Sequence, residues 1–420
     1  MKLSAFGEKF TSNSGILSLM DDLGNALASG EEMIMMGGGN PAHIPEVESA
    51  FKRRLQRILD NHDEFVRLIG TYDAPQGEKH FIEALVKLLN NRFGWGLTTD
   101  NIALTNGSQN AFFILFNLFA GTYSDGTTRQ IQLPLAPEYI GYADAGLSQN
   151  FFSATRPDIE LLEGNLFKYR VDFSQLELGE HTGAVCVSRP TNPTGNVITD
   201  DEVARLDAMA QAQKVPLIID GAYGQPFPNL LFTPATPMWN PNTILCLSLS
   251  KLGLPALRTG IVIAREEVIK ALSGVNAILS LSPNSAGSML ALEMIRDGSI
   301  LSLSDNVIRP FYQQRAQVAV DHLRQRLAGY NFHIHKPEGA MFLWLWFEGL
   351  PISSLELYSR LKARGVLVVS GHYFFPGMEE EWQHSHECIR VTYTRSPAEV
   401  QRGLDIIAEE VIRAFNEGGA

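Results

Sequence analysis

Six short apolar segments alternate with longer amphipathic stretches in the middle of the chain. They are nearly continuous in apolar residues rather than alternating, as expected for buried strands of a parallel sheet. The segments span residues 102–106, 131–135, 184–188, 216–220, 244–250 and 260–264. Helix-like patterns separate several of them; residues 199–213 open with Thr-Asp-Asp-Glu, a favourable capping start. The pattern predicts an α/β fold with a mostly parallel sheet, and a ligand site beyond the carboxyl ends of its strands.

The last part of the chain has a different pattern. A long helix is predicted at residues 307–327, and short strands and helices follow it up to a final helix from Pro397. This order is typical of an α+β unit, so we expect a second, smaller domain there. The expected division is residues 1–45 as an N-terminal arm and part of the small domain, 46–305 as the large domain and 306–420 as the small C-terminal domain.

Composition and charge narrow the class of protein. The 420 residues are 45% hydrophobic and 19% charged, as in ordinary globular proteins. The formal net charge of -12 disfavours nucleic-acid or anionic-membrane partners, because Lys and Arg hold both. The apolar segment Met341–Phe347 is far shorter than the about 20 residues that a membrane span needs. Cys186, Cys246 and Cys388 are far apart, and the start of the chain lacks a secretory pattern, so we expect reduced thiols and a cytoplasmic protein.

Several common ligand motifs are absent from the sequence. It has no G-x-x-x-x-G-K-[ST], G-x-G-x-x-G, H-E-x-x-H or G-x-S-x-G pattern. His384, His386 and Cys388 form H-x-H-x-C, and alternation on a strand would place all three on one face, as a metal site requires. The alternative is a polar lead-in to the strand CIRVTY, and on balance we expect no metal.

The segment SLSKLGLPALRTG, residues 248–260, follows a predicted buried strand. A lysine at such a place is costly to desolvate unless it is paired or covalently used. Burial lowers the pKa of an amine, which favours a lysine that reacts with a carbonyl group. Ser248 and Arg258 flank Lys251 and are good phosphate donors. The alternative is a solvated lysine beside a surface arginine.

Two other strand ends carry polar side chains. The strand PLIID ends at Asp220, and Tyr223 follows three residues later. A buried carboxylate there could keep a ring nitrogen protonated, and the tyrosine hydroxyl could bond a ring oxygen. Asn192, in the loop SRPTNPTGN, could donate to the same oxygen. The alternatives are a helix N-cap for Asp220 and an ordinary turn for the loop.

Four further segments contain candidate contacts. The turn TNGSQ places Gly107, Ser108 and Gln109 at a helix N-terminus, where backbone N–H groups bind anions. In APEYIGY, Tyr139 could stack on a flat ring or pack on the next helix. Arg390 lies among apolar residues in CIRVTY, and either a substrate carboxylate or a structural Asp or Glu could pair with it. Tyr72 lies in a polar loop and could be only a turn tyrosine.

Taken in order, these elements resemble the class I/II aminotransferases, which are fold-type I enzymes dependent on pyridoxal 5'-phosphate (PLP). The family's Y-x-x-P-x-G, G-[ST]-x, P-x-Y, N-P-T-G, D-x-x-Y and S-x-S-K patterns all occur here in order. An arginine follows the lysine by seven residues, and a late arginine-bearing strand completes the set. The resemblance covers nearly the whole chain. It implies a large domain with a mostly parallel sheet and a smaller α+β domain.

The resemblance also implies roles at the cofactor. Lys251 would bond to PLP and shuttle the proton, and Asp220 would pair with the pyridine nitrogen. Tyr223 and Asn192 would bond the ring oxygen, and Tyr139 would stack on the ring. The residues implied for the phosphate are Gly107, Ser108, Gln109, Ser248, Ser250 and Arg258.

Substrate and subunit contacts follow from the same resemblance. Arg390 would bind the substrate α-carboxylate with help from Asn192 and the backbone at Gly39. Tyr72 would reach the phosphate of the other subunit, which implies a homodimer with shared active sites. Two departures concern the rim of the pocket, where Pro255-Ala256 and Ser370-Gly371 replace common Pro-Gly pairs.

These features predict an aminotransferase that acts on small-molecule amino acids and 2-oxo acids. The expected pocket segments GGGNPAHIP, EGAMFLW and ILSLSPNSAG are neutral apart from Glu338 and a histidine. A distal carboxylate would be unpaired there, so we expect alanine, 2-aminobutyrate and valine over aspartate and glutamate, with pyruvate as an acceptor. A PLP-dependent C–S lyase or an α-oxoamine synthase would use the same groups. A PLP-sensing regulator is disfavoured, since no room for a DNA-binding domain precedes the phosphate turn.

Overall fold

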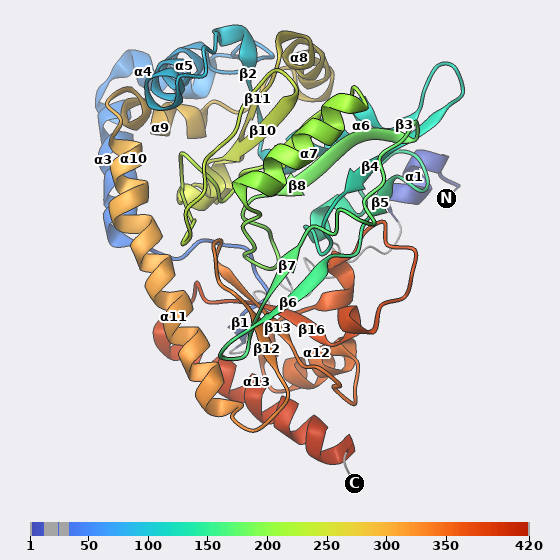
Figure 1. Cartoon of the computed structure of the whole chain (residues 1–420). Helices are drawn as coiled ribbons and strands as arrows, with labels where there is room; N and C mark the ends of the chain where they lie inside the picture. The colour runs from blue at the N-terminus through green and yellow to red at the C-terminus, as the bar shows by residue number, and fades with distance from the viewer. Residues whose placement is uncertain (1, 12–23, 25–32, 419–420) are drawn as a thin grey trace.

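The computed structural model describes residues 2–11, 24 and 33–418, and the rest of this section concerns these residues. They form an eight-stranded sheet and a six-stranded sheet, with the long helix α11 (Arg309–Arg326) running from one to the other (Figure 1). The order of the large sheet is β2-β11-β10-β9-β8-β4-β3, and β5 pairs with β4. The order of the small sheet is β15-β16-β13-β12-β7-β6.

The strands of the large sheet match the apolar segments of the sequence. Their bounds are β2 (Ile102–Asn106), β3 (Gly121–Thr122), β4 (Thr128–Leu133), β5 (Phe152–Ala154), β8 (Thr182–Ser188), β9 (Leu217–Asp220), β10 (Thr243–Ser248) and β11 (Thr259–Ile263). Strands β4, β5, β8, β9 and β10 run parallel to their neighbours in this group. Strand β11 is antiparallel to both β10 and β2. The sheet is thus mostly parallel, with two reversed strands, β11 and the short edge strand β3, which is antiparallel to β4.

Helices cover both faces of the large sheet. Successive residues of a strand point to opposite faces, so Ile218 and Ile219 belong to different core clusters. Phe112 of α6 packs on the first of these faces, and Leu206 of α7 on the second. Helix α7 begins at the capping box of Thr199. The helices of this half are α3 (Pro45–Asp60), α4 (His62–Gly70), α5 (Lys79–Phe93), α6 (Ser108–Phe119), α7 (Asp200–Ala212), α8 (Glu266–Ser280), α9 (Ala286–Arg296) and α10 (Ser299–Leu303).

The small sheet is built chiefly from the C-terminal part of the chain. Its C-terminal strands are β12 (His333–His335), β13 (Phe342–Trp346), β15 (Val369–Ser370) and β16 (Cys388–Thr392). Helices α12 (Ser354–Ala363) and α13 (Pro397–Gly418) pack beside it. The N-terminal strand β1 (Ile34–Met35) pairs with β14 (Val366–Leu367), which ties the N-terminal segment to this half.

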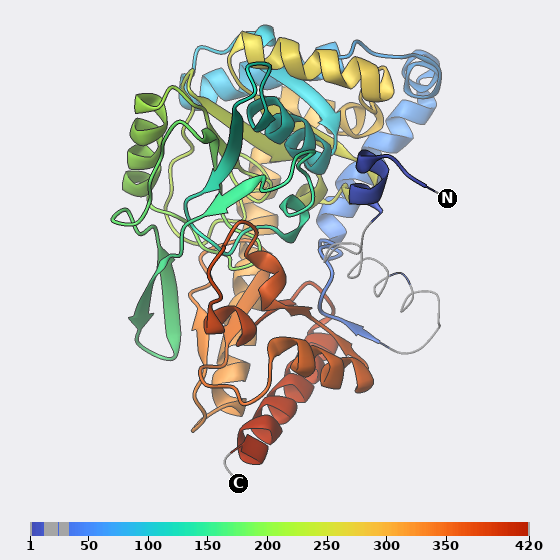
Figure 2. The ribbon, with the colours of Figure 1, turned by 90° about the vertical axis from the view of Figure 1, so that its right-hand side faces the viewer.

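One hairpin departs from the division expected from the sequence. Strands β6 (Asp158–Leu162) and β7 (Leu166–Arg170) lie inside the range 46–305, but β7 pairs in parallel with β12 of the small sheet. Figure 2 shows this hairpin extending from the large-sheet half toward the C-terminal half. Lys168 forms a buried ion pair with Glu338 and also donates to Asn196 at 2.8 Å. Neither sheet is therefore made from one continuous stretch of chain.

The histidine–cysteine pattern does not form the arrangement that a metal would need. His384 and His386 lie in the short helix η7 (Gln383–His386), and only Cys388 lies in a strand. The assumption of strand alternation was therefore wrong. Among the described residues no cluster of three or more His, Cys, Asp or Glu side chains could hold a metal ion. Within the described residues, no helix has both the length and the apolar character that a membrane span requires.

Candidate active site

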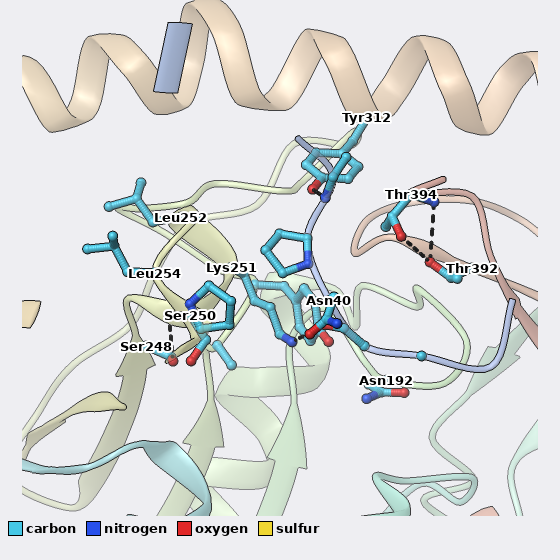
Figure 3. Close-up of a pocket in the computed structure, with 18 of the residues that line it drawn as sticks. Asn40, Asn192, Ser248, Ser250, Lys251, Leu252, Leu254, Tyr312, Thr392 and Thr394 are labelled. Carbon is cyan, nitrogen blue, oxygen red and sulfur yellow. Dashed lines mark hydrogen bonds between the residues drawn. The ribbon is translucent and has the colours of Figure 1, made fainter. Parts of the chain in front are cut away.

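A cavity of about 1410 Å³ lies where the carboxyl ends of β8, β9 and β10 face the small sheet. Figure 3 shows Lys251, Asn192 and the serines of the segment after β10 around this space. Most residues predicted from the sequence line it. They are Gly39, Ser108, Gln109, Tyr139, Asn192, Asp220, Tyr223, Ser248, Ser250, Lys251, Arg258 and Arg390. The fold thus brings together residues that are far apart in the sequence.

Lys251 lies in the short helix η3 (Ser250–Leu252), directly after β10. Its Nζ donates to the carbonyl of Gly39 at 2.7 Å and lies 5.4 Å from the ring centroid of Tyr223. Burial lowers the pKa of Lys251 to about 8, and the charges of Arg390 and Arg258 act in the same direction. The amine is therefore partly unprotonated near neutral pH, as a nucleophile must be.

This pKa predicts how the cofactor-free enzyme should react with PLP. Only the unprotonated amine attacks a carbonyl, so the rate of PLP capture should rise with pH, reach half its maximum near pH 8 and level off above about pH 9. An unperturbed lysine, with a pKa of 10.5, would give a rate that keeps rising well beyond pH 9. Stopped-flow absorbance of PLP mixed with cofactor-free enzyme from about pH 6 to 10 measures the profile. A rate that still climbs above pH 9 would contradict the assignment.

Asp220 ends β9 and is buried below the cavity. Its Oδ1 accepts the backbone N–H of Ala222 at 2.9 Å, and its Oδ2 accepts the hydroxyl of Tyr142 at 2.6 Å. Burial raises the pKa of Asp220, and these two hydrogen bonds lower it. In the described part of the chain no cationic side chain forms an ion pair with it; only the more distant charge of Lys251 acts on it. A protonated ring nitrogen would supply the missing partner.

The predicted phosphate turn is built by close backbone packing. Gly107 has φ +86°, and a Cβ there would lie 2.3 Å from Nη2 of Arg258. Arg258 is itself left-handed, with φ +44°, and donates to the carbonyl of Pro255 at 3.2 Å. A Cβ at Gly260 would lie 2.7 Å from the backbone N of Ser108. Gly260 was not identified from the sequence, yet its lack of a side chain lets β11 approach the turn.

Gln109 and Gly107 differ in their contacts at the predicted phosphate turn. The Gln109 side chain donates to the carbonyl of Gly141 at 2.7 Å, and its Oε1 is buried without a partner. Because the side-chain amide of Gln109 is used in this hydrogen bond, the backbone N–H of Gln109, at the start of α6, is the group that is available to bind a phosphate. Gly107 does not line the cavity but lies under Arg258. Its contribution is thus to the shape of the turn.

Arg390 lies in the middle of β16 and is buried. It donates to Oδ1 of Asn192 at 2.7 Å and to the carbonyl of Gly37 at 2.6 Å, while its Nε has no partner. Phe342 packs on its guanidinium at 4.2 Å. Burial lowers the pKa of Arg390 to about 10. The structural Asp or Glu that could have explained this arginine is not present among the described residues, so an anionic ligand is the remaining explanation.

Two backbone carbonyls of the glycine strip, residues 37–39, accept hydrogen bonds from cationic side chains. The carbonyl of Gly37 accepts from Arg390, and that of Gly39 accepts from Lys251. The expected contact between the Gly39 backbone and a substrate carboxylate stays a prediction, and Gly37 is the glycine whose carbonyl contacts Arg390. A Cβ at Gly38 would meet nothing within 4 Å, so open space remains beside the strip.

Three tyrosines of the prediction occupy distinct places. Tyr223 is buried in the cavity wall, and burial raises its pKa well above the ordinary range. Tyr139 lines the cavity with its ring edge-on to Tyr142 at 5.4 Å. Tyr72 is apart from the cavity of its own chain and is 80% exposed. The single chain therefore leaves Tyr72 without a role.

The groups around the cavity fit PLP. They include an amine of lowered pKa, a buried carboxylate without a cationic partner, a helix N-terminus beside an arginine and a second arginine with an unpartnered Nε. These match the aldehyde, the ring nitrogen, the phosphate and a substrate carboxylate. Tyr142 and Glu138, which the sequence analysis missed, lie in the segment APEYIGY beside Tyr139.

Comparisons with known proteins agree with this fit. Residues 144–407 match the family described as aminotransferase class I and II. The chain is 52% identical over 417 residues to the valine–pyruvate aminotransferase of Escherichia coli K12, covering 99% of this chain and 100% of that protein. The crystal structure of the valine-pyruvate aminotransferase of Salmonella typhimurium LT2 has a TM-score of 0.89 and 50% identity, with 96% of this chain and 100% of that one covered.

A more distant structure has the same fold. The aspartate aminotransferase of Thermus thermophilus, solved with maleate, has a TM-score of 0.79 at 20% identity and covers 98% of this chain and 100% of its own. The resemblance read from the motifs is confirmed by the family match and the full-length relative. This chain belongs to the class I and II aminotransferases and is a PLP-dependent enzyme of that family.

Proposed function

We propose that this aminotransferase moves an amino group between a small apolar amino acid, such as valine, alanine or 2-aminobutyrate, and pyruvate. The observation that carries the proposal is the 52% identity along the full length of the valine–pyruvate aminotransferase of Escherichia coli. The relatives reported above are all aminotransferases, which gives no support to a C–S lyase.

The cations of the cavity support this substrate class. Of the three expected pocket segments only GGGNPAHIP lines the cavity; EGAMFLW and ILSLSPNSAG do not line it in the described chain. Two arginines that the sequence argument did not count, Arg315 and Arg395, do line it. Arg395 is paired with Glu399 at 2.9 Å, and Arg315 donates to the carbonyl of Arg395 at 2.5 Å. Both are already engaged, so a distal carboxylate would need to displace an internal partner.

The chain's own residues then have separate tasks in the proposed reaction. Bound PLP supplies the carbonyl that takes up the amino group and a ring that withdraws electrons from the substrate α-carbon. Arg390 binds the substrate carboxylate and thereby orients the α-carbon toward Lys251. Lys251, as a free amine, would take the proton from the α-carbon and give it back in the second part of the transfer. With PLP bound, Asp220 would hold the ring nitrogen protonated, and Tyr223 and Asn192 would donate to the ring oxygen.

The substrate proposal predicts a strong preference against acidic donors. The ratio of kcat/KM for valine to that for aspartate should be about 100 or more, because an unpaired buried carboxylate costs several kcal/mol. Half-reactions followed by the absorbance of the bound cofactor, with each amino acid in turn, measure the ratio. Leucine is a useful control, since it tests size without adding charge. Aspartate equal to valine would show that Arg315 or Arg395 is available to substrates.

We further propose that the active unit is a homodimer in which Tyr72 serves the partner's phosphate site. The Tyr72 loop is tied to residues 276–285 by the bond from Asn276 to the carbonyl of Pro75 at 3.0 Å. Both segments expose apolar side chains, with Tyr72 80% and Ile278 85% exposed. Exposed apolar side chains grouped in this way favour an interface.

Mixed dimers test the shared site. Tyr72→Ala and Lys251→Ala are each expected to be nearly inactive, and a heterodimer of the two contains one intact site. Refolding an equal mixture should recover about one quarter of the wild-type activity, because about half the dimers are mixed and half their sites are intact. Each variant refolded alone is the control. An enzyme that sediments as a monomer and is fully active in the assay would refute the proposal.

The cysteines bear on where the enzyme works. Cys186, Cys246 and Cys388 are all buried and free. Unpaired thiols are typical of a reducing compartment, which supports our proposal of a cytoplasmic enzyme.

A further inference from the structure

A second carboxyl group, that of Glu138, is buried close to Asp220. Glu138 is 0% exposed. Its Oε1 accepts the backbone N–H of Ser188 at 2.7 Å, and its Oε2 lies 2.5 Å from the hydroxyl of Ser188. No cationic side chain of the described residues compensates it, and the charge that acts on it is that of Asp220. Glu138 does not line the cavity, so substrates do not explain its burial.

Two hydroxyl groups connect Glu138 to Asp220. Ser188 is the register partner of Asp220 in the adjacent strand. The hydroxyl of Tyr142 lies 3.5 Å from that of Ser188 and donates to Oδ2 of Asp220 at 2.6 Å. Tyr142 is fully buried, with Phe112 and Phe116 packed on its ring at 5.0 Å. Aromatic packing thus covers the Tyr142 end of the path, while Ser188 and Asp220 also line the cavity.

The charges of this network do not balance if both carboxyl groups are ionised. Bound PLP would supply one cation, its ring nitrogen, to Asp220, and no cationic side chain among the described residues compensates Glu138. Two linked carboxylates with one cation leave a buried charge uncompensated, which is strongly unfavourable. Burial raises the pKa of Glu138 to about 8, and the charge of Asp220 acts in the same direction. Ionisation of Asp220 thus favours the neutral form of Glu138.

Protonation of Glu138 also decides the direction of the hydrogen bonds. Its Oε1 accepts from the Ser188 N–H at 2.7 Å, whereas Oε2 accepts from the Tyr139 N–H at the longer distance of 3.3 Å, so the proton belongs on Oε2 and points at the Ser188 hydroxyl. Ser188 is then free to donate to Tyr142, and Tyr142 donates to Asp220. An ionised Glu138 would instead accept from Ser188 and remove the donor behind Tyr142.

We propose that Glu138 is protonated in the holoenzyme and acts, through Ser188 and Tyr142, as a positioning residue that keeps Asp220 ionised against the cofactor nitrogen. The inference rests on the PLP-dependent function. It adds Glu138 and Tyr142, which lie behind Asp220 and do not line the cavity.

The test reads the ring nitrogen directly. Holoenzyme is reconstituted with PLP labelled with nitrogen-15 on the ring, and the chemical shift of that nitrogen reports its protonation. Tyr142→Phe should move the signal toward that of neutral pyridine and lower kcat about tenfold, the effect of losing one hydrogen bond to a charged group. Ser188→Ala should move the signal in the same direction. Tyr393→Phe, which removes another buried hydroxyl bonded only to the carbonyl of Ala340, is the matched control and should leave the signal in place.

Glu138→Gln tests the protonation state. A glutamine amide can accept from the Ser188 N–H and donate to its hydroxyl, as a protonated carboxyl does. The ring-nitrogen signal should therefore keep the wild-type position, while the infrared carbonyl band of a protonated carboxyl group should disappear. A signal that moves as far as in Tyr142→Phe, or a wild-type enzyme without that band, would overturn the proposal. A wild-type enzyme that does not bind PLP or does not catalyse transamination would instead refute the proposed function, so the two failures are distinguishable.

Discussion

Replacement of Lys251 by alanine is expected to lower kcat by about 10⁴-fold, the upper end of the range attributed to a positioned acid–base group. No other lysine lines the cavity in the described part of the chain, so none can take over the proton transfer. The variant should still bind PLP, because the groups assigned to the phosphate and the ring nitrogen remain. Absorbance spectra should show the free aldehyde of the cofactor rather than its lysine adduct.

The control for this experiment is an exposed lysine. Lys270 on α8 pairs with Glu266 at 2.5 Å on the surface, and Lys270→Ala should leave kcat unchanged. Borohydride reduction of wild-type holoenzyme followed by peptide mapping should place the cofactor on Lys251. A label on another lysine would refute the assignment, whatever the activity of the variant.

Replacement of Asp220 by asparagine is expected to have the second largest effect. The side-chain oxygen of asparagine can still accept the N–H of Ala222, and its NH2 group can donate to the Tyr142 hydroxyl, which turns to accept, so the fold should be retained. It does not hold the ring nitrogen protonated, and breaking a buried charge pair of this kind costs about 3–5 kcal/mol. We therefore expect kcat to fall by about 10²–10³-fold, measured in single-turnover half-reactions with valine.

A cofactor analogue separates the electronic role of Asp220 from a structural one. PLP methylated at the ring nitrogen carries a fixed positive charge and should restore part of the lost rate in Asp220→Asn. Asp207→Asn is the matched control: Asp207 is buried and accepts from Gln211 and Asn240, but lies outside the cavity. Its replacement should lower the melting temperature without changing kcat. A failure of the analogue to restore any rate would indicate that Asp220 is only structural.

The large sheet could be predicted from the sequence because its strands are buried on both faces. Runs such as 184–188 and 244–250 are apolar at nearly every position, and this signal does not depend on the rest of the fold. The direction of β11 could not be predicted, since an apolar run looks the same in either orientation. The hairpin of β6 and β7 was missed because β6 is mostly exposed and lacks such a run. Its position depends on pairing with β12, far along the chain.

Some residues of the candidate site could also be predicted from the sequence, and others could not. Lys251 and Asp220 follow strand ends, and that position alone suggests chemistry. Gly260 and Tyr142 could not be identified, because their importance depends on contacts with Ser108 and Asp220 that only the folded chain creates. The arginines 315 and 395 were missed because their segments show no pattern that points to the cavity.

The pairing of β7 with β12 limits how this protein can be divided or recombined. The backbone N–H of Ile334 donates to Asn165 at 2.8 Å, and that of Lys336 donates to Phe167 at 2.8 Å. A fragment that begins after residue 305 would therefore leave the edge of β12 unpaired, an arrangement prone to aggregation. A chimaera that exchanges the C-terminal half with that of a relative must carry residues 158–170 from the same parent. The unit that can be grafted between homologues is thus discontinuous in the gene.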